Sequence, residues 1–376
     1  MKKSTKNILL VHSSNDLYGA SKILITIIEI LIKSGHSIHL ILPEDGPLNN
    51  HKSLINVHLS IINVGVFRKK YLNFFGLLNR FVFIIKSTIQ IKKIIIKNKI
   101  DIVYTNTSTV VSPTFAAFLS KIPSIFHVHE IPFGSNLYTK FLIKIFNLFS
   151  KKIIAVSHST RDFWIQKGVI KNKIKVINNG FDFDFSTNKK TNKNKVVFTN
   201  ISRIIPYKGH LFLIDLFNEI FKKRNDLILQ IVGDTLPFYN DYFKSLKSKL
   251  KEHKIEKNIN FLGFRNDIKS ILDKSHFLIH TPISPDPLPT VIFEAIQSKT
   301  AVICTDNGGA RDILNDFSNG LLIDCNDIKK SAQLILNYMD DLNRQKKNVN
   351  DSINFILKNF NNEIFSQKIK SLISET

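Results

Sequence analysis

Short apolar segments alternate with longer amphipathic segments along the whole chain. The apolar segments have the length of buried strands, and the amphipathic ones repeat every three to four residues, as helices do. Strands that alternate with helices pair in parallel through right-handed crossovers, so the pattern predicts an α/β fold of doubly wound parallel sheets. The predicted strands are Ile8–His12, Ile38–Leu42, Ile102–Thr105, Ser124–Val128 and Ile153–Val156, then Val196–Ile201, Leu227–Val232, Ile259–Leu262, His276–His280 and Ala301–Thr305.

A polar segment divides these elements into two groups. The chain has 376 residues, which is more than one ordinary core holds and suits two domains. Branched apolar residues become scarce around residues 182–195, as in a connector. The sequence therefore predicts an N-terminal domain over 1–182, a linker over 183–195 and a C-terminal domain over 196–348. Residues 349–376 have a helical pattern, and we expect them to pack back toward the N-terminal domain.

The composition of the chain bears on the cellular compartment in which the protein works. The chain has no run of eighteen uncharged apolar residues, and no small-residue cleavage site follows its first residues, so we expect neither a spanning helix nor a secretory signal. Cys304 and Cys325 are the only cysteines, too few for a disulfide framework or a multi-thiolate metal site. A cytoplasmic location fits these features.

Positive charge is concentrated in the first half of the chain. Residues 1–180 contain 25 Lys and Arg against 7 Asp and Glu, whereas the remainder has 28 against 23. No acidic residue occurs from His51 to Ile100, and nine basic residues lie among apolar ones between Arg68 and Lys99. Leu72–Ile96 and Tyr138–Phe149 both mix aromatic, aliphatic and basic residues. These stretches suit interfacial helices on an anionic membrane, although helices that cover a sheet have a similar pattern.

The loops that follow predicted strands contain the candidate chemistry, because ligands of parallel α/β sheets bind at the carboxyl ends of the strands. Gly19, after the first strand, lets backbone N–H groups approach an anion at a helix start; ordinary turn chemistry is the alternative. Arg203 and Lys208, after the first strand of the second domain, suit a diphosphate, or are simply solvated cations.

Two carboxylates flank the start of a predicted helix in the second domain. Asp286 lies in a loop stiffened by Pro285, Pro287 and Pro289, and Glu294 follows little more than one turn into the helix. Carboxylates placed in this way can accept hydrogen bonds from sugar hydroxyls. The alternative is that the first caps a turn and the second faces solvent. A further glycine-bearing loop, residues 306–312, follows the next strand.

An acid followed by seven residues and then Glu resembles the donor-binding signature of family 4 glycosyltransferases. The similarity spans nearly the whole chain, because several other landmarks occur in the expected order. They are Asp16-Leu17-Tyr18-Gly19-Ala20, His127-Val128-His129-Glu130, Ala155-Val156-Ser157, Asn178-Asn179-Gly180-Phe181-Asp182, Arg203 with Lys208-Gly209, Val232-Gly233-Asp234, Phe261-Leu262-Gly263 and Gly308-Gly309.

The resemblance implies two facing Rossmann-like domains, the GT-B fold, with a deep interdomain cleft. It implies a nucleotide-diphosphate sugar bound mainly by the second domain and an acceptor bound mainly by the first. Glu294 would hold the ribose hydroxyls and Asp286 would approach hydroxyls of the donor sugar. Arg203 and Lys208 would neutralise the diphosphate, which Gly19 would approach with backbone N–H groups, and Gly233 belongs to the donor-binding landmarks. His129 matches a histidine that lies near the reacting sugar.

Two departures from the family pattern affect the donor site. The first acid is Asp286 where the family commonly has Glu, and Pro287-Leu288-Pro289 replaces a glycine-rich run. Proline has no N–H to offer a phosphate, which leaves Thr290 and Val291 as amide donors. The family usually transfers with retention and without a bound metal. Asp182-Phe183-Asp184 has the letters of a metal motif but lies at the linker, so we expect no metal and no other cofactor.

The leading hypothesis is a glycosyltransferase that acts on a lipid-linked or surface-polysaccharide acceptor, associated peripherally with the inner face of the cell membrane. A nucleotide-sugar epimerase of similar fold is one alternative, and it would need acids and bases that the sequence does not identify. A noncatalytic basic protein that binds membrane or nucleic acid is another. We expect no nucleic-acid partner, because arginine is scarce in the basic half and no known base-reading motif occurs.

Overall fold

The computed structural model describes residues 5–17, 19–67, 73–132, 136–187, 189 and 194–376. Tyr18, Arg68, Lys69, Lys70 and Leu72 lie outside the described residues, as do 188 and 190–193 of the predicted linker. The chain forms two compact units. Unit 1 comprises residues 1–181 and 360–376, and unit 2 comprises residues 182–359.

Unit 1 is built on a parallel sheet. Among the described residues it has seven strands in the order β3-β2-β1-β4-β5-β6-β7, in which the strand order reverses beside β1, as in doubly wound folds. The strands β1, β4 and β5 are central, and nearly all of their residues are buried. The strands are β1 (Asn7–Val11), β2 (Ser37–Leu42), β3 (His58–Ile61), β4 (Ile102–Thr105), β5 (Ser124–Val128), β6 (Lys152–Ala155) and β7 (Ile174–Val176).

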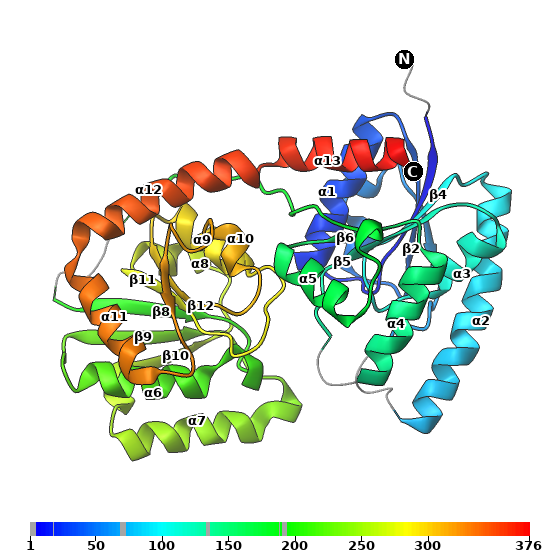
Figure 1. Cartoon of the computed structure of the whole chain (residues 1–376). Helices are drawn as coiled ribbons and strands as arrows, with labels where there is room; N and C mark the ends of the chain where they lie inside the picture. The colour runs from blue at the N-terminus through cyan, green and yellow to red at the C-terminus, as the bar shows by residue number, and fades with distance from the viewer. Residues whose placement is uncertain (1–4, 18, 68–72, 133–135, 188, 190–193) are drawn as a thin grey trace. The chain divides into compact units, whose positions relative to one another are not determined.

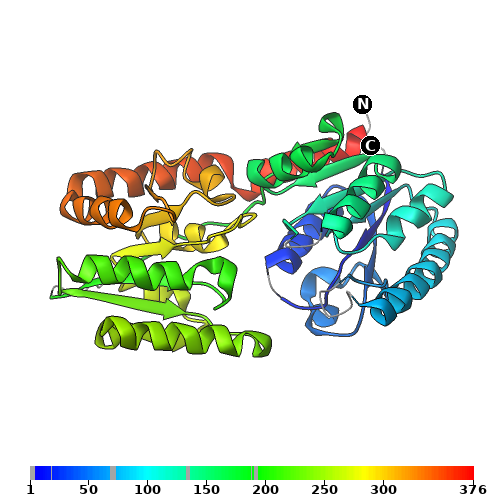
Figure 2. The ribbon, with the colours of Figure 1, turned by 60° about the horizontal axis from the view of Figure 1, so that its bottom comes forward.

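Helices follow the strands of unit 1 and cover the sheet (Figure 1). The helix α5 begins at Ser157, whose hydroxyl accepts from the N–H of Thr160, and ends at Gly168 with a left-handed φ of 113°. The helix α2 packs against α3 and runs along one side of the unit (Figure 2). The helices are α1 (Gly19–Lys33), α2 (Phe74–Lys97), α3 (Ser112–Leu119), α4 (Asn136–Phe149), α5 (His158–Lys167) and α13 (Asn362–Glu375).

The C-terminal helix α13 is part of the unit 1 core. It packs against α1, and Phe365, Ile369 and Leu372 are buried in the same apolar cluster as Ile27. The N–H of Phe181 donates to the carbonyl of Phe360 at 2.8 Å, where the chain returns to unit 1. The tail therefore divides at Phe360, because α12 (Leu342–Asn359) runs through the boundary predicted at 349 and belongs to unit 2.

Unit 2 repeats the architecture with a second parallel sheet. Six strands of the described chain have the order β10-β9-β8-β11-β12-β13, which again reverses at the first strand of the unit. Both units are thus Rossmann-like α/β structures, as predicted. The strands are β8 (Val196–Ile201), β9 (Leu227–Val232), β10 (Ile259–Gly263), β11 (Phe277–His280), β12 (Ala301–Thr305) and β13 (Leu321–Ile323).

Two groups of helices enclose the sheet of unit 2. The helix α6 packs against α7 and α11, while α9 packs against α8, α10 and α12. Figure 1 shows these groups on opposite sides of the strands. Phe198, Phe217 and Phe277 stack in the core between α6 and the sheet. The helices are α6 (His210–Phe221), α7 (Asn240–His253), α8 (Ile268–Asp273), α9 (Thr290–Gln297), α10 (Ala310–Ile313), α11 (Ile328–Asp340) and α12.

The helix α2 has two apolar faces. One face, with Ile84, Ile91 and Ile95, is buried. The other face is exposed and follows the three-to-four residue period of a helix. We call it the α2 stripe, and it comprises Phe75, Leu78, Phe81, Val82, Ile85, Ile89 and Ile96.

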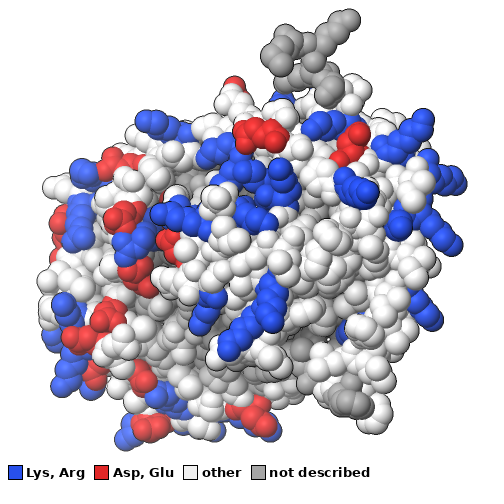
Figure 3. All heavy atoms as spheres, turned by 45° about the vertical axis from the view of Figure 1, so that its right-hand side comes forward, with Lys and Arg blue, Asp and Glu red and all other residues white. Residues whose placement is uncertain are grey.

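Exposed lysines accompany the α2 stripe. Lys86, Lys93 and Lys97 are exposed on the same helix and have no ion-pair partner within the described part of the chain. Figure 3 brings this side of the molecule forward and shows blue basic side chains among white ones, with few red acidic ones on its right-hand part. No helix in the described ranges is both long and apolar enough to span a bilayer.

Candidate active site

The loops that follow β11 and β12 touch each other at the carboxyl edge of the unit 2 sheet. The N–H of Asp286 donates to the carbonyl of Asn307 at 3.0 Å, and the N–H of Gly309 donates to the carbonyl of Asp286 at 2.7 Å. Gly308 has a φ of +110°, and a Cβ at this position would lie 2.0 Å from the Asp286 carbonyl oxygen. Only glycine fits such an approach, so this pair of loops fixes the backbone of Asp286.

The Asp286 side chain is the centre of a polar cluster. Its Oδ2 accepts hydrogen bonds from Lys208 Nζ and from His280 Nε2, the latter at 3.0 Å. Burial opposes ionisation of Asp286, but the hydrogen bond from His280 and the charge of Lys208 outweigh it and hold the pKa of Asp286 below its ordinary value. The second oxygen, Oδ1, has no hydrogen-bond partner among the described residues and remains an acceptor for a ligand.

His280 is neutral in this cluster and donates through Nε2. Burial lowers its pKa, although the hydrogen bond to Asp286 acts in the opposite direction. Its Nδ1 is buried without a hydrogen-bond partner within the described residues, and in the neutral ring this nitrogen carries no proton. His280 therefore orients the Asp286 carboxylate without adding a charge.

The loop that follows β8 brings two cations to the same edge. Gly209 has a φ of +75°, and a Cβ there would lie 2.0 Å from the carbonyl oxygen of Thr281, so this loop lies directly against the one after β11. Lys208 thereby reaches Asp286, while Arg203 is exposed. Burial raises the pKa of Tyr207, the positive charge of Arg203 opposes the rise, and the charge of Asp286 adds to it. Both charges thus lie near the same phenol.

The predicted amide donors lie at the start of α9. This helix begins at Thr290 after Pro289, without a side-chain cap. The N–H groups of Thr290 and Val291 precede the intrahelical hydrogen bonds, and the helix dipole favours an anion beside them. Glu294 is exposed one turn further along the helix.

Gly233, the remaining predicted donor-binding residue of unit 2, has a clear backbone role. Its φ is +134°, and a Cβ would lie 2.0 Å from the carbonyl oxygen of Ser202. Its N–H donates to the carbonyl of Gly263 at 2.8 Å. Gly233 therefore joins the loops that follow β8, β9 and β10.

His129, the predicted histidine of unit 1, lies directly after β5 in a cluster of polar side chains. Its Nε2 is 3.0 Å from Asn106 Oδ1, and its ring centroid is 4.1 Å from that of His127. His127 is fully buried and its Nδ1 lies 2.9 Å from the Tyr104 hydroxyl. Burial and the neighbouring His127 and His12 lower the pKa of His129 well below its ordinary value, so the ring is neutral at physiological pH.

The carboxylate of Glu130 organises the loop that follows β4. It accepts from the Thr107 hydroxyl at 2.6 Å and from the hydroxyl and N–H of Ser108 at 3.0 and 3.2 Å. Gly19 is exposed at the first position of α1, where an added Cβ would meet no atom within 4 Å. Its predicted role depends on its N–H group rather than on close packing.

The sequence analysis assigned no role to three members of these clusters. His280 lies at a strand end and Glu130 closes a family landmark, but the sequence gives neither a partner, and Asn106 has no distinguishing motif. The position of Asn106 directly after β4 was the one available signal, because carboxyl-end positions of neighbouring strands meet at one edge.

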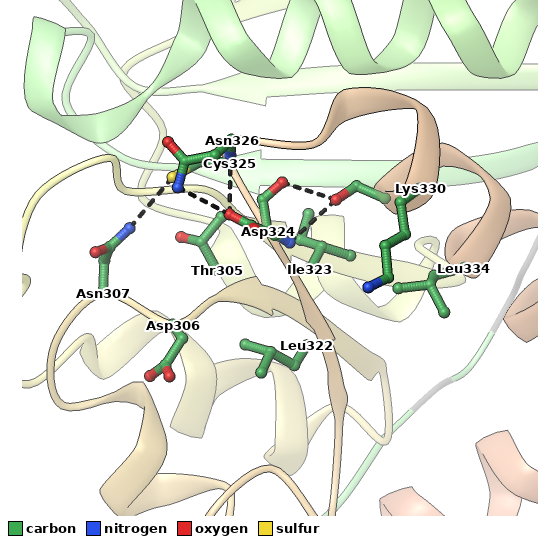
Figure 4. Close-up of a pocket in the computed structure, with 11 residues that line it drawn as sticks. Thr305, Asp306, Asn307, Leu322, Ile323, Asp324, Cys325, Asn326, Lys330 and Leu334 are labelled. Atoms are coloured by element: carbon green, nitrogen blue, oxygen red, sulfur yellow. Dashed lines mark hydrogen bonds between the residues drawn. The ribbon is translucent and has the colours of Figure 1, made fainter.

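A pocket lined by both polar and apolar residues opens beside the loop cluster, at the ends of β12 and β13 (Figure 4). Asn307 connects it to that cluster, because its side-chain amide donates to the carbonyl of Pro282 at 2.9 Å and lies 3.7 Å from Cys325 Sγ. Asp324, Asn326 and Lys330 line its other side. No predicted site residue belongs to the lining that the structure describes.

Two Rossmann-like units, with a cation and carboxylate cluster at the carboxyl edge of the second sheet, define a protein of the GT-B glycosyltransferase type. The chain belongs to the glycosyl transferases group 1 family, whose model matches residues 182–373. The Glycosyltransferase Family 4 model matches residues 18–185. The protein is therefore a glycosyltransferase, as the resemblance predicted, and the epimerase and noncatalytic alternatives are not favoured.

Similar proteins agree with this assignment. The UDP-Gal:alpha-D-GlcNAc-diphosphoundecaprenol alpha-1,3-galactosyltransferase of Escherichia coli is 28% identical over 95% of this chain and 93% of its own length. The capsular polysaccharide biosynthesis glycosyltransferase CapH of Staphylococcus aureus is 31% identical over 44% of this chain and 46% of its own. The crystal structure of Anabaena HepE in complex with UDP and glucose has a TM-score of 0.79 at 23% identity, covering 99% of this chain and 100% of HepE.

Proposed function

We propose that this glycosyltransferase moves a sugar from a nucleotide-diphosphate donor to a lipid-linked or surface-polysaccharide acceptor, with retention of the anomeric configuration. Family membership supports sugar transfer, and the E. coli relative is named for a diphosphoundecaprenol-linked acceptor and a UDP-linked donor. The observation that carries the proposal is the cluster of Lys208, Asp286 and His280 at the carboxyl edge of the unit 2 sheet.

Unit 2 holds the donor in this proposal. Cleavage of the bond between the sugar and the diphosphate leaves negative charge on the phosphate, which Arg203 and Lys208 stabilise. An ammonium group has three donors, so Lys208 can bind a phosphate oxygen while it keeps its bond to Asp286. The free Oδ1 of Asp286 accepts from a donor hydroxyl, and Glu294 accepts from the ribose. The N–H groups of Thr290 and Val291 add partial positive charge, and Gly233 keeps the adjoining loops in place.

The cations of unit 2 make a metal unnecessary in this proposal. Arg203 and Lys208 supply two positive charges where a divalent ion would otherwise neutralise the diphosphate. We therefore expect transfer to be unaffected by a chelator and to need no other cofactor.

Unit 1 serves the acceptor and the reacting sugar. The neutral ring of His129 is suited to a hydrogen bond with a sugar hydroxyl, and the N–H of Gly19 begins a helix whose dipole favours the diphosphate. These roles follow from the family resemblance and from the polar surroundings of His129.

An anionic membrane surface is the proposed location, on the cytoplasmic face. Phe75, Phe81 and Ile89 are 79%, 60% and 54% exposed on α2. The same helix contains several lysines, and no acidic residue occurs in the sequence from His51 to Ile100. Water is a poor environment for such a surface, whereas the headgroup region accepts aromatic rings and binds the cations. Leu137 and Leu148 on α4 are also exposed, so a second helix of unit 1 presents large apolar side chains at the surface.

A donor and acceptor screen tests this function. The purified protein is incubated with UDP-Gal, other UDP-hexoses and GDP-mannose, with and without a GlcNAc-diphospho-lipid, and each reaction is run with and without EDTA. We expect acceptor-dependent release of the nucleoside diphosphate and a product whose new linkage keeps the donor's anomeric configuration. Conversion of the donor sugar without release would favour the epimerase alternative. An inverted linkage would contradict retention, and inhibition by EDTA would contradict the metal-free site.

A further inference from the structure

A directed chain of hydrogen bonds runs through the interior of unit 1, and its first part fixes the proton of His12. The Ser21 hydroxyl donates to Asp16 Oδ1 at 2.7 Å, so the Ser21 oxygen is an acceptor toward its other neighbour. That neighbour is His12 Nε2 at 3.1 Å, with the Ser14 hydroxyl at 3.3 Å from the same nitrogen. His12 therefore carries its proton on Nε2, and its Nδ1 is an acceptor.

The second part of the chain runs through Asn106. Its amide nitrogen Nδ2 donates to the carbonyl of Ala20 at 3.1 Å, which fixes the orientation of the amide because a carbonyl only accepts. The second N–H of the same nitrogen faces His12 Nδ1 at 3.3 Å. The Asn106 backbone oxygen is also 3.3 Å from His12 Nδ1, but both atoms are acceptors in this arrangement.

The amide oxygen of Asn106 completes the assignment. Oδ1 lies 3.0 Å from His129 Nε2, and an oxygen can only accept there, so Nε2 of His129 carries the proton. In a neutral ring, Nδ1 is then an unprotonated acceptor, and it has no hydrogen-bond partner in the part of the chain that the structure describes.

The surroundings of His129 keep both rings neutral. Burial lowers the pKa of His12 to about 4, and it lowers that of His129 well below its usual range. The titratable groups around His129 are His12 after β1, His127 in β5 and Glu130 beside it. The Glu130 carboxylate accepts from the His129 backbone N–H at 3.2 Å rather than from the ring.

We propose that Asn106 is a positioning residue that holds His129 in its Nε2–H tautomer, so that Nδ1 accepts a hydrogen bond from a hydroxyl group of the bound sugar. The identity of the ligand rests on the proposed function, whereas the tautomer of His129 rests only on the contacts of the Asn106 amide with Ala20, His12 and His129. In the other tautomer, Nδ1 would present a hydrogen to the hydroxyl, and the deprotonated Nε2 would lose its hydrogen bond to the Asn106 amide oxygen.

The tautomer is measured directly by NMR of the full chain with 15N-labelled histidine, and no substrate is needed. The signals of His129 are assigned by their loss in His129→Asn. We expect an unprotonated Nδ1 and a protonated Nε2 in the wild type, and exchange between both tautomers in Asn106→Leu. Asn147→Leu is the matched control, because the amide group of Asn147 is likewise hydrogen-bonded, in its case to two backbone groups, but lies on α4, away from the histidines.

Two results would overturn the proposal: a protonated Nδ1 of His129 in the wild type, or an unchanged tautomer in Asn106→Leu. If Asn106→Leu does not fold, Asn106→Asp replaces it. The carboxylate still accepts from Nε2 and adds a negative charge, so the pKa of His129 should rise in the same spectra and the acid limb of the rate profile should move upward. An unmoved His129 pKa in that variant also counts against the proposal.

Activity separates the positioning role from the proposed function. With an active donor and acceptor, Asn106→Leu should lower kcat about tenfold, the effect of one lost hydrogen bond, with a smaller change in the donor KM. A normal kcat in this variant would contradict the role in positioning. If no donor is transferred while the wild-type tautomer is as assigned, the proposed function fails and the positioning of His129 by Asn106 stands.

Discussion

Lys208 and Asp286 form a largely buried ion pair, although 78 residues separate them in the chain. The pair joins the loop after β8 to the loop after β11, and His280 donates a second hydrogen bond to the same carboxylate oxygen. A cation and an acid that were assigned separately to the phosphate and to the sugar are therefore one structural unit. Ligand binding at either residue acts on the other.

Replacement of Lys208 with Ala should have a larger effect on turnover than on the thermal stability of the protein. The variant loses a cation at the leaving diphosphate, and we expect kcat to fall by about 100-fold. The pKa of Asp286 should rise, because the charge that favours its ionised form is gone. Lys244→Ala is the control, since Lys244 forms an exposed ion pair on α7. Steady-state kinetics and thermal unfolding on both variants decide the matter, and wild-type turnover in Lys208→Ala would remove this lysine from the site.

Replacement of Glu294 with Ala should weaken binding of the nucleotide sugar without unfolding the protein. The side chain is exposed, so little packing is lost, whereas two hydrogen bonds from ribose hydroxyls would be absent. We expect the donor Kd to rise about tenfold or more. Glu252→Ala removes an exposed carboxylate on α7 and serves as the comparison. Equal affinity of the two variants, measured by calorimetry, would contradict the ribose role.

Gly308→Ala should destabilise unit 2 and disturb the donor site together. The new methyl group would lie 2.0 Å from the Asp286 carbonyl oxygen, in addition to the strain of a φ of +110°. We expect a loss of about 3 kcal/mol in unfolding free energy. Gly263→Ala is matched to it, because Gly263 also has a positive φ, of +64°, but no atom within 4 Å of the added Cβ. That control should lose only about 1 kcal/mol, and similar losses in both variants would show that the close approach to Asp286 is unimportant.

Unfolding stability should fall as the pH drops below 6.5. Burial lowers the pKa of His127 to about 3, so between these values the unfolded chain binds a proton that the folded chain excludes. This residue alone should cost about 2 kcal/mol between pH 7 and pH 5. In His127→Asn, which keeps an acceptor for the Tyr104 hydroxyl, the loss over that interval should shrink by this amount. Urea titrations monitored by Trp164, a buried residue of unit 1, measure it, and an unchanged pH slope would be evidence against a neutral His127.

The α2 stripe should direct the protein to anionic vesicles. Binding to phosphatidylglycerol vesicles should exceed binding to phosphatidylcholine, and Lys86→Gln with Lys93→Gln should weaken it about tenfold or more, at roughly 1 kcal/mol per cation. Phe81→Ser should weaken binding to phosphatidylglycerol vesicles and to phosphatidylcholine vesicles alike. Phe238→Ser removes a side chain of 70% exposure from unit 2 and is the control.

A fluorescent reporter gives a second view of the membrane contact. Trp164 is the single tryptophan and is fully buried, so the extra emission of Phe81→Trp reports on the α2 surface. Its emission should shift to the blue on addition of anionic vesicles, because the ring leaves water. If the emission does not shift, and if the wild type and all variants bind to the vesicles equally well, this surface does not enter the bilayer.

The sequence predicted the central strands of both sheets and the loops that carry the candidate residues. Most residues of these strands are apolar and buried, and this pattern is visible in the sequence without any partner strand. The edge strands β3, β7 and β13 were missed, because β7 and β13 have only three residues and β3 and β7 are partly exposed. At an edge, pairing with the neighbouring strand decides the conformation, and the local pattern does not record it.

The amino-acid sequence by itself determined the α/β class, the two doubly wound units and the residues at the strand ends, because these depend on local periodicity and on the order of elements. Only the tertiary structure decided that Lys208 shares an oxygen of Asp286 with His280, that Asn106 faces both His12 and His129, and that the tail divides at Phe360. Those relationships depend on which strands are neighbours and on how closely backbone loops approach at Gly209 and Gly308. Contacts of that kind join residues far apart in the chain, and no local pattern encodes them.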